Sequence, residues 1–514
     1  MYQGASVTVK RFRLISSLLI STLSINSALA LPIDWTGVFG VDTHMINNTC
    51  RTGDQVDAPD PTQPQTGTQG ISGDCDASFQ TYVFKLNPQI IVNDGVTLKG
   101  EFSSGYIRGG FAGDNSSNNR DGSANNSYFF TSSAQRSGLN VNQMYMELYA
   151  DTALVKIGRM SKHYGMGIVF DNGNDAWDRF FTMYDGIEAD MRIGNFSLIP
   201  YWAKISSYND EKNNNSSVGA KPAGDFDVRE VGVTAVYDNK NRDLVVSVLY
   251  AKRFSEPKNS LYNSNTNNPV PPAPAPPSTG DELNNRGKTK ITVIEPYISK
   301  KWNKLKVAFE ASLQTGDYGD IYKDGTGSSK LAANAYILEA KYELNPKWDL
   351  GFTGGQISGD KGSSGKFEAA YLHPNYQIAD LMFRYNYPSF TEGGRSIFDS
   401  SMTNARFYKV NGHYKTDKWV WKGALIMATA METAKQGLAY HHENNYTFTA
   451  TKDQSDDLGL EVDFGFDYKW NPNVTISGYY GYWKVGNYYA FSNEPKDLGL
   501  KNVHGGGLKA TLEF

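Results

Sequence analysis

The feature that most constrains this chain is a period-two alternation of apolar and polar residues that recurs along almost its whole length. In Leu458–Trp470, LGLEVDFGFDYKW, every even-numbered position is apolar or aromatic, and most odd-numbered positions are charged: Glu461, Asp463, Asp467 and Lys469. Successive side chains of a β-strand point to opposite faces. The pattern therefore predicts strands that have one apolar face and one charged face.

The connections between the patterned segments alternate in length. Short turns such as Asn93–Gly95 and Asn345–Lys347 are followed by long polar connections such as 163–184 and 255–288. No interior segment approaches the ~20 apolar residues that a membrane helix requires. Strands of this kind, joined alternately by short turns and long loops, are typical of antiparallel up-and-down barrels in outer membranes, with short periplasmic turns and long extracellular loops.

The polarity of the two strand faces indicates which face lies in lipid. In Val96–Phe102 the apolar Val96, Leu98 and Phe102 oppose Lys99 and Glu101. A wide barrel places its apolar face in the membrane and its charges around a wet lumen. Four tryptophans adjoin predicted short turns, as in an aromatic girdle at the periplasmic interface: Trp302, Trp348, Trp419 and Trp470.

These patterns predict an all-β fold, in which residues 31–514 form a single large transmembrane barrel of about 18–20 strands. Twenty strands result if Phe367–His373 and Gln377–Tyr387 are separate strands, and eighteen if part of that region is irregular. Both termini are expected on the periplasmic side, and this parity favours the split into twenty.

The two ends of the chain predict its destination. Lys10, Arg11 and Arg13 precede a short apolar run that ends in Ser27–Ala30, which predicts a signal peptide over residues 1–30. At the other end, Leu508–Phe514 alternates strictly and ends in Phe. It resembles the terminal strand that the outer-membrane assembly machinery reads in Gram-negative bacteria, so we expect a multi-pass barrel in that membrane, in contact with its lipid and lipopolysaccharide.

Cys50 and Cys75 lie in one polar segment of an exported chain. Because the destination is oxidising, they predict a disulfide that closes this loop, with two free thiols or a metal site as the alternatives. No other cofactor or metal is expected, because Asp171–Asp175 lacks the Gly and distal Glu of a calcium loop and Tyr164–Gly167 lacks the residues of a phosphate loop. The net charge of −4 does not favour a nucleic-acid partner.

One interior segment, Lys156–Phe196, is the most informative for function. It contains Gly158-Arg159, then Tyr164–Gly167, and then Asp185-Gly186 at the start of the next strand. This arrangement resembles porin-like and alginate-export-like outer-membrane channels. The resemblance implies that the loop at about 163–184 folds into the lumen and narrows it, and that the chain forms a homotrimer.

A filter at the constriction would consist of charges from this loop and from the strand that follows. The candidates are Asp171, Asp175, Asp178, Arg179 and Asp185, facing Glu188, Asp190 and Arg192. Other charges expected in the lumen are Lys99, Glu101, Glu147, Lys306, Glu310, Asp380, Arg384, Glu461 and Asp463. Opposed charges would filter solutes by charge and size. The alternative is an external loop with solvated charges.

The sequence thus predicts a porin for passive diffusion of small hydrophilic solutes, with weak charge selectivity and an acid-leaning lumen. Another function is an adhesin or structural barrel that acts through its long loops. An outer-membrane enzyme is less favoured, because no Gly-x-Ser-x-Gly motif is found and the histidines are scattered.

Overall fold

The computed structural model describes residues 33–49, 76–104, 108–111, 139–208, 226–255, 289–319, 329–364, 366–385, 401–441 and 447–514. The predicted signal peptide, the predicted disulfide between Cys50 and Cys75, and the proline-rich tract Pro269–Pro277 lie outside these residues. Within the described part, no helix has the length and apolar character needed to cross a membrane.

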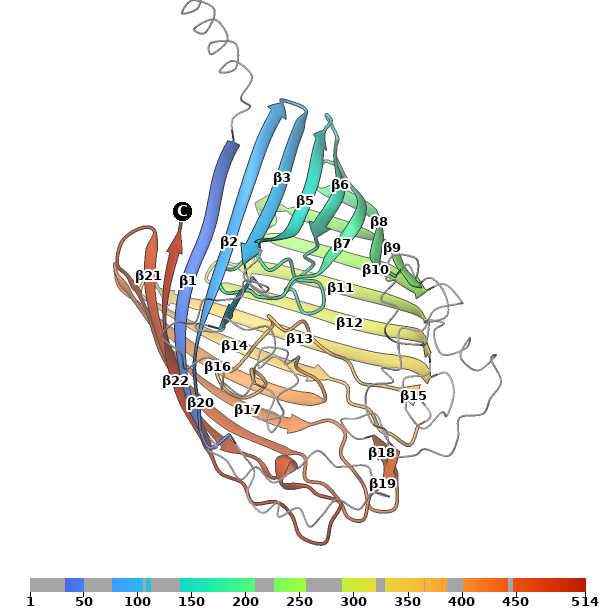
Figure 1. Cartoon of the computed structure of the whole chain (residues 1–514), viewed down its shortest axis with the longest axis vertical. Helices are drawn as coiled ribbons and strands as arrows, with labels where there is room; N and C mark the ends of the chain where they lie inside the picture. The colour runs from blue at the N-terminus through green and yellow to red at the C-terminus, as the bar shows by residue number, and fades with distance from the viewer. Residues whose placement is uncertain are drawn as a thin grey trace, which may run out of the picture.

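Eighteen long strands form one antiparallel sheet that closes on itself (Figure 1). They are β1 (Ile33–Asn47), β2 (Ala77–Asn93), β3 (Val96–Ser104), β5 (Leu139–Tyr149), β6 (Ala153–Ser161), β7 (Met183–Ile193), β8 (Phe196–Tyr208), β9 (Phe226–Asn239), β10 (Leu244–Ser255), β11 (Lys290–Trp302), β12 (Leu305–Gly319), β13 (Ser329–Asn345), β14 (Trp348–Ile357), β16 (Ala405–Lys415), β17 (Trp419–Ala430), β20 (Asp457–Lys469), β21 (Val474–Val485) and β22 (Val503–Glu513). Each strand pairs with its neighbours in chain order, which confirms the predicted up-and-down barrel.

The barrel closes where the last long strand meets the first. β22 pairs with β1 from Val38 opposite Glu513 to Asn47 opposite His504, and Gly37 N donates to Phe514 O at 2.7 Å. Four short strands accompany the barrel: β4 (Gly109–Phe111), β15 (Lys366–Phe367), β18 (Ala439–His441) and β19 (Thr447–Thr449). Two 3-10 turns, η1 (Lys240–Arg242) and η3 (Asn487–Ala490), complete the described elements.

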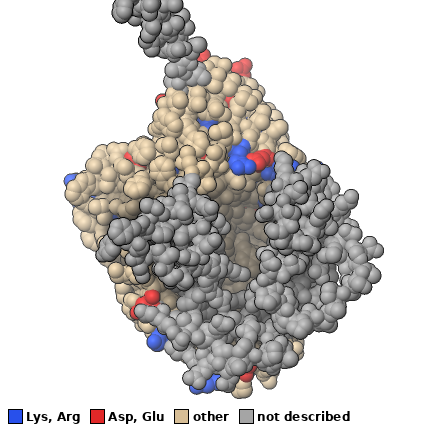
Figure 2. All heavy atoms as spheres, in the orientation of Figure 1, with Lys and Arg blue, Asp and Glu red and all other residues tan. Residues whose placement is uncertain are grey.

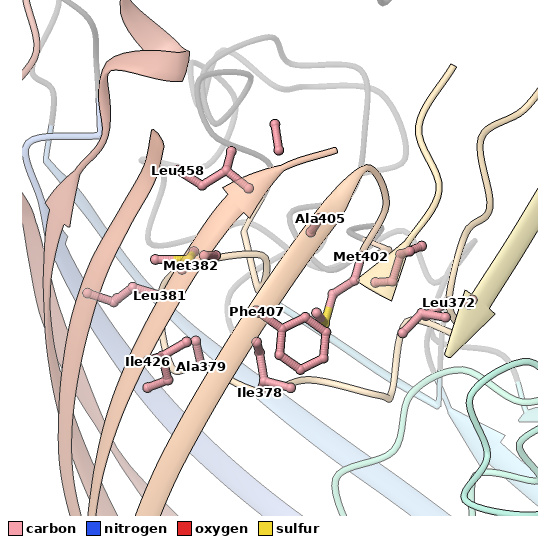
Figure 3. Close-up of a cluster of buried hydrophobic side chains, with 14 of the residues drawn as sticks. Leu372, Ile378, Ala379, Leu381, Met382, Met402, Ala405, Phe407, Ile426 and Leu458 are labelled. Atoms are coloured by element: carbon pink, nitrogen blue, oxygen red, sulfur yellow. The ribbon is translucent and has the colours of Figure 1, made fainter. Parts of the chain in front are cut away.

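The favoured count of twenty strands is wrong, because Phe367–His373 and the described part of Gln377–Tyr387 do not form wall strands. β14 pairs directly with β16, so no strand separates them. The apolar side chains of this region, including Leu372, Ile378 and Met382, are buried against the inner side of the barrel (Figure 3). These side chains therefore contact apolar residues of the wall from inside the barrel and do not face lipid.

The outer wall carries the predicted apolar faces. Ile187, Leu338 and Phe464 are exposed there, and few charged atoms are visible on the described wall in Figure 2. The predicted girdle tryptophans Trp302, Trp348 and Trp470 are exposed beside the short turns. Exposed apolar side chains on a barrel of this size are what a lipid environment requires.

Leu458 departs from the predicted outward face of its strand. It is 3% exposed and packs in the inner apolar cluster. The register between β17 and β20 shifts at Ala428 and Thr429, opposite Gly459, which has a φ of 111°. This bulge turns Leu458 inward, because an extra residue in one strand reverses the faces beyond it.

Candidate functional site in the lumen

The connection between β6 and β7, residues 162–182, crosses the lumen and is called here the first lumen loop. On one side, Lys85 Nζ of β2 donates to Gly173 O at 3.3 Å, and Trp177 Nε1 donates to Thr511 Oγ1 of β22 at 2.8 Å. On the opposite side, Tyr164 OH donates to Glu295 O of β11. These contacts join the loop to strands on two sides of the barrel and fix it at both ends of its path.

Arg108 and Gly173 fix the turn of the first lumen loop. Arg108 forms a bidentate ion pair with Glu101 at 2.7 and 2.8 Å, and its Nη1 donates to Gly173 O at 2.7 Å. Gly173 has a φ of +65°, and a Cβ there would lie 2.0 Å from Arg108 Nη1 and 2.5 Å from Phe180 O. Glycine is required by both the backbone conformation and the close approach.

A second segment also enters the lumen and was not predicted. This second lumen loop, residues 366–385, binds carboxylates of β20: Leu381 N and Met382 N donate to Glu461 at 2.7 and 2.6 Å. Asp380 N donates to Asp463 Oδ2 at 3.2 Å. Leu381 and Met382 are themselves buried in the inner apolar cluster shown in Figure 3. These two predicted lumen carboxylates therefore hold a loop in place.

The two lumen loops contact each other and form one partition. Asn375 Nδ2 donates to Asp171 Oδ1 at 2.9 Å and to Phe180 O at 2.8 Å. His373 N donates to Ile168 O at 2.7 Å. A solute that crosses the barrel must pass beside this partition.

The pKa values of two carboxyl groups in the first lumen loop are shifted in opposite directions. Although burial opposes it, hydrogen bonds from His163, Asn375 and Gly173 N lower the pKa of Asp171 to about 2. Burial, followed by the nearby charge of Asp171, raises the pKa of Asp178 to about 6. The hydrogen bond to Asp171 raises the pKa of His163. The partition therefore contains groups that change charge in mildly acidic solution.

A cavity of about 390 Å³ lies against the second lumen loop and the wall from β16 to β22. Four cationic side chains line it, together with three carboxylates, His413 and the rings of Trp177 and Tyr479. The cations are Arg384, Lys409, Lys422 and Lys509, and the carboxylates are Asp380, Asp463 and Asp467.

The cations of the cavity differ in their partners. Arg384 and Lys422 lie 3.7 and 2.7 Å from Asp380 and Asp467. Lys409 Nζ donates to Ile378 O at 2.7 Å, and Lys509 Nζ lies 5.1 Å from the Trp177 ring centroid. Among the described residues, neither Lys409 nor Lys509 forms an ion pair with a carboxylate. The cavity thus has four cationic side chains against three carboxylates.

Most carboxylates predicted to line the lumen are paired with cations. Glu147 lies 3.0 Å from Lys99, Glu188 lies 3.1 Å from Lys156, and Asp190 lies 2.7 Å from Arg192. Glu101 is paired with Arg108 as described above, and Glu310 accepts a hydrogen bond from Met166 N. Lys306 is exposed at the start of β12. Pairing offsets part of the acidic bias that the sequence alone indicated, whereas Glu310, Glu461 and Asp463 bind backbone amides.

The predicted filter residues are only partly brought together. Asp171, Asp175 and Asp178 share the first lumen loop, and Arg179 anchors that loop by donating to Thr81 Oγ1 at 2.6 Å. Asp185 is not in the lumen. It shares the outward face of β7 with the exposed Ile187, because inward and outward positions alternate along a strand, and it binds Arg159 at 2.8 Å.

Lys409, Lys422, Lys509, Trp177 and Tyr479 were missed as lumen candidates. The three lysines occupy charged positions in alternating strands, so the period-two pattern could have placed them inside. Trp177 carries no such signal, because it reaches the cavity from a loop.

The chain was compared with known proteins. The sequence profile of the family described as alginate export matches residues 114–496, about three quarters of the chain. No curated protein matches the chain. Solved structures with a similar fold include Pseudomonas aeruginosa OccK2 (OpdF), at 9% identity and a TM-score of 0.47, covering 94% of this chain and 98% of that one. Another is Pseudomonas aeruginosa OccK8 (OprE), at 10% identity and a TM-score of 0.45, with the same coverage.

Proposed function

Since this chain belongs to the alginate export family, whose barrels lie in the Gram-negative outer membrane, we propose that it is a channel for passive diffusion of small hydrophilic solutes. The observation that carries the proposal is the charge-lined cavity beside the two lumen loops. A polar lumen removes the cost of taking a polar solute through hydrocarbon. Transport of this kind involves no catalytic step.

The charges of the cavity support a weak preference for anions, in place of the cation preference that an acid-leaning lumen would give. Lys409 and Lys509 add positive charge that no carboxylate of the described residues offsets by an ion pair, whereas the lumen carboxylates Glu101, Glu147 and Glu188 are paired. Charges that line a narrow, low-dielectric passage attract solutes of opposite sign. The preference should be weak, because three carboxylates share the same cavity.

The size of the cavity supports small solutes. Its volume of about 390 Å³ falls in the range of pockets that enclose one small molecule. Alginate is a polyanion, and a lining of mixed charge with alternating ion pairs does not suit a dedicated polyanion route.

The proposal is tested by swelling of liposomes that contain the refolded, signal-free chain. Glucose, glucuronate and glucosamine have similar sizes and differ in charge. We expect all three to enter, with glucuronate fastest, and we expect Lys509→Gln to reduce the glucuronate advantage. Equal entry of the three sugars in the unmutated chain would contradict the anion preference.

A barrel that inserts but admits no sugar would contradict the channel itself. That outcome would favour the adhesin or structural alternative, in which the extracellular loops contact a partner.

A further inference from the structure

One turn of the second lumen loop, residues 373–376, contacts the first lumen loop and is called here the junction turn. It lies between Leu372 and Ile378, which are both buried in the inner apolar cluster (Figure 3). Tyr376 N donates to His373 O at 2.9 Å, which closes the turn. Because its two ends are anchored by buried side chains, the internal hydrogen bonds of the turn decide where its other side chains point.

The imidazole ring of His373 supplies one of these internal hydrogen bonds. Asn375 N donates to His373 Nδ1 at 3.3 Å. A ring nitrogen accepts a hydrogen bond only when it carries no proton, so the ring is neutral in this arrangement and its proton is on Nε2. The junction turn therefore depends on an acceptor that acid removes.

Two turns of the barrel wall have the same hydrogen bond with a different acceptor. In Asn345–Lys347 and Asn471–Asn473, the side-chain oxygen of the first Asn accepts from the backbone N–H two residues later, at 2.9 Å in each turn. All three turns have Pro in the second position, but the junction turn has His373 in place of the first Asn. An amide oxygen remains an acceptor at every pH, whereas an imidazole nitrogen does not. The acceptor of the junction turn is thus the titratable one of the three.

The junction turn directs Asn375 at the first lumen loop. Asn375 Nδ2 donates to Asp171 Oδ1 at 2.9 Å and to Phe180 O at 2.8 Å. His373 N donates to Ile168 O at 2.7 Å. These hydrogen bonds between the two loops all originate in the junction turn. A change in the turn therefore changes the coupling of the loops.

The surroundings of His373 oppose a proton on its ring. Within the described part of the chain, the charged and titratable groups that act on it are Asp171 and His163 of the first lumen loop, and Arg108. Asp171 already binds His163 and Asn375. Burial, which outweighs the attraction of Asp171, lowers the pKa of His373. A proton on His373 would add a cation beside Arg108 and His163, against a carboxylate that already has other donors.

We propose that the junction turn is an acid-sensitive latch between the two lumen loops, with His373 as its sensor. A proton on Nδ1 converts the acceptor into a donor that faces the Asn375 N–H. The turn then opens, Asn375 withdraws from Asp171 and Phe180, and the partition of the lumen loosens. The effect on solute passage rests on the proposed channel function, whereas the latch itself requires no conduction.

The direction of the pH dependence follows from the lowered pKa. The docked state binds the proton of His373 more weakly than the undocked state, so the latch is intact above the ordinary value of 6.5 and weakens as pH falls below it. His163 acts in the opposite direction, because its hydrogen bond to Asp171 raises its pKa. Asp178, whose pKa is also raised, likewise favours docking when protonated. Both groups belong to the first lumen loop, so the latch is measured in the second.

The test is hydrogen exchange of residues 371–377 in the refolded, signal-free chain at pH 5 and pH 7.5, corrected for intrinsic rates. We expect exchange about tenfold faster at pH 5, as the loss of a buried hydrogen bond implies. His373→Asn keeps an acceptor, as in the turns that begin at Asn345 and Asn471, and cannot be protonated. It should exchange equally at the two pH values. The control His163→Gln removes the other histidine near the junction and should keep the acid response.

Two results would overturn the latch: equal exchange at both pH values in the unmutated chain, or an acid response that persists in His373→Asn. If His373→Asn fails to fold, Asn375→Ala decides, because it should exchange fast at both pH values, and an acid response in this variant would overturn the latch. Conductance fluctuations in planar bilayers should be more frequent at pH 5 than at pH 7.5. Acid-dependent exchange in a barrel that conducts nothing would support the latch and contradict the channel.

Discussion

The turn at Gly173 shows how a single residue holds the partition of the lumen. Its carbonyl accepts hydrogen bonds from both Arg108 and Lys85, and its Cα faces the Arg108 guanidinium too closely for a side chain. Arg108 is in turn oriented by Glu101. A charge on the wall, an arginine near it and a glycine in the loop thus form one structural unit.

Gly173→Ala should release the first lumen loop. The positive φ and the contact with Arg108 together should cost about 1–3 kcal/mol. We expect faster hydrogen exchange in residues 162–182 and a larger, noisier conductance. Gly194→Ala is the control, because Gly194 has a φ of +61° but nothing within 4 Å of its Cβ position. Equal exchange in both variants would show that the contact with Arg108 is unimportant.

Asp178 should make the docking of the loop depend on pH. Its folded-state pKa of about 6 lies above the ordinary value of 3.8. The folded state therefore binds the proton more tightly, and this contribution to stability is full below pH 3.8 and lost as pH rises through 6. After correction for intrinsic rates, protection of residues 162–182 from exchange should fall between pH 4 and 7.

The variant Asp178→Asn should remove this part of the pH dependence. Asp175→Asn removes the same charge from the same loop and serves as the control. An unchanged pH profile in Asp178→Asn would contradict the assignment.

At the scale of elements, the wall could be predicted from sequence and the second lumen loop could not. Wall strands repeat a local pattern that their two solvents, lipid and water, impose on every strand. The apolar side chains that residues 366–385 bury inside the lumen meet wall residues such as Phe407 and Ile426, which are distant in sequence. The short apolar runs in this segment indicated wall strands. A segment that is buried inside the lumen has no periodic pattern of its own that would distinguish it from such a strand.

The same limit applies to the candidate site. Alternation predicted inward positions for Glu101 and Glu461, which are buried, but carried no information about Arg108 or the loop amides that bind them. The net charge of the passage depends on these partners. The anion preference proposed above therefore differs from the cation preference that an acid-leaning lumen would give.

Asn375 connects the two lumen loops, and Asn375→Ala should uncouple them. Loss of its hydrogen bonds to Asp171 and Phe180 should cost about 1–3 kcal/mol of docking free energy. We expect more frequent conductance fluctuations in single-channel recordings. Asn375→Asp should have a larger effect than the alanine variant, because it places a second carboxylate beside Asp171. The same fluctuation rate in all three proteins would contradict the coupling.

At the scale of the whole molecule, the barrel separates two environments. Its outer wall is apolar, and its lumen contains paired charges around a cavity lined by four cations and three carboxylates. Both environments follow from one strand alternation, which places apolar side chains on one face of the wall and charged side chains on the other. The lumen and the outer wall can therefore be altered independently.

Reversal potential in a planar bilayer under a salt gradient tests the central claim most directly. The unmutated chain should conduct steadily with a modest preference for anions, and Lys509→Gln should shift the reversal potential toward cation preference. Lys330→Gln, which removes an equal charge from the outer wall, should leave the reversal potential unchanged. Cation preference in the unmutated chain, or insertion without conductance, would contradict the account.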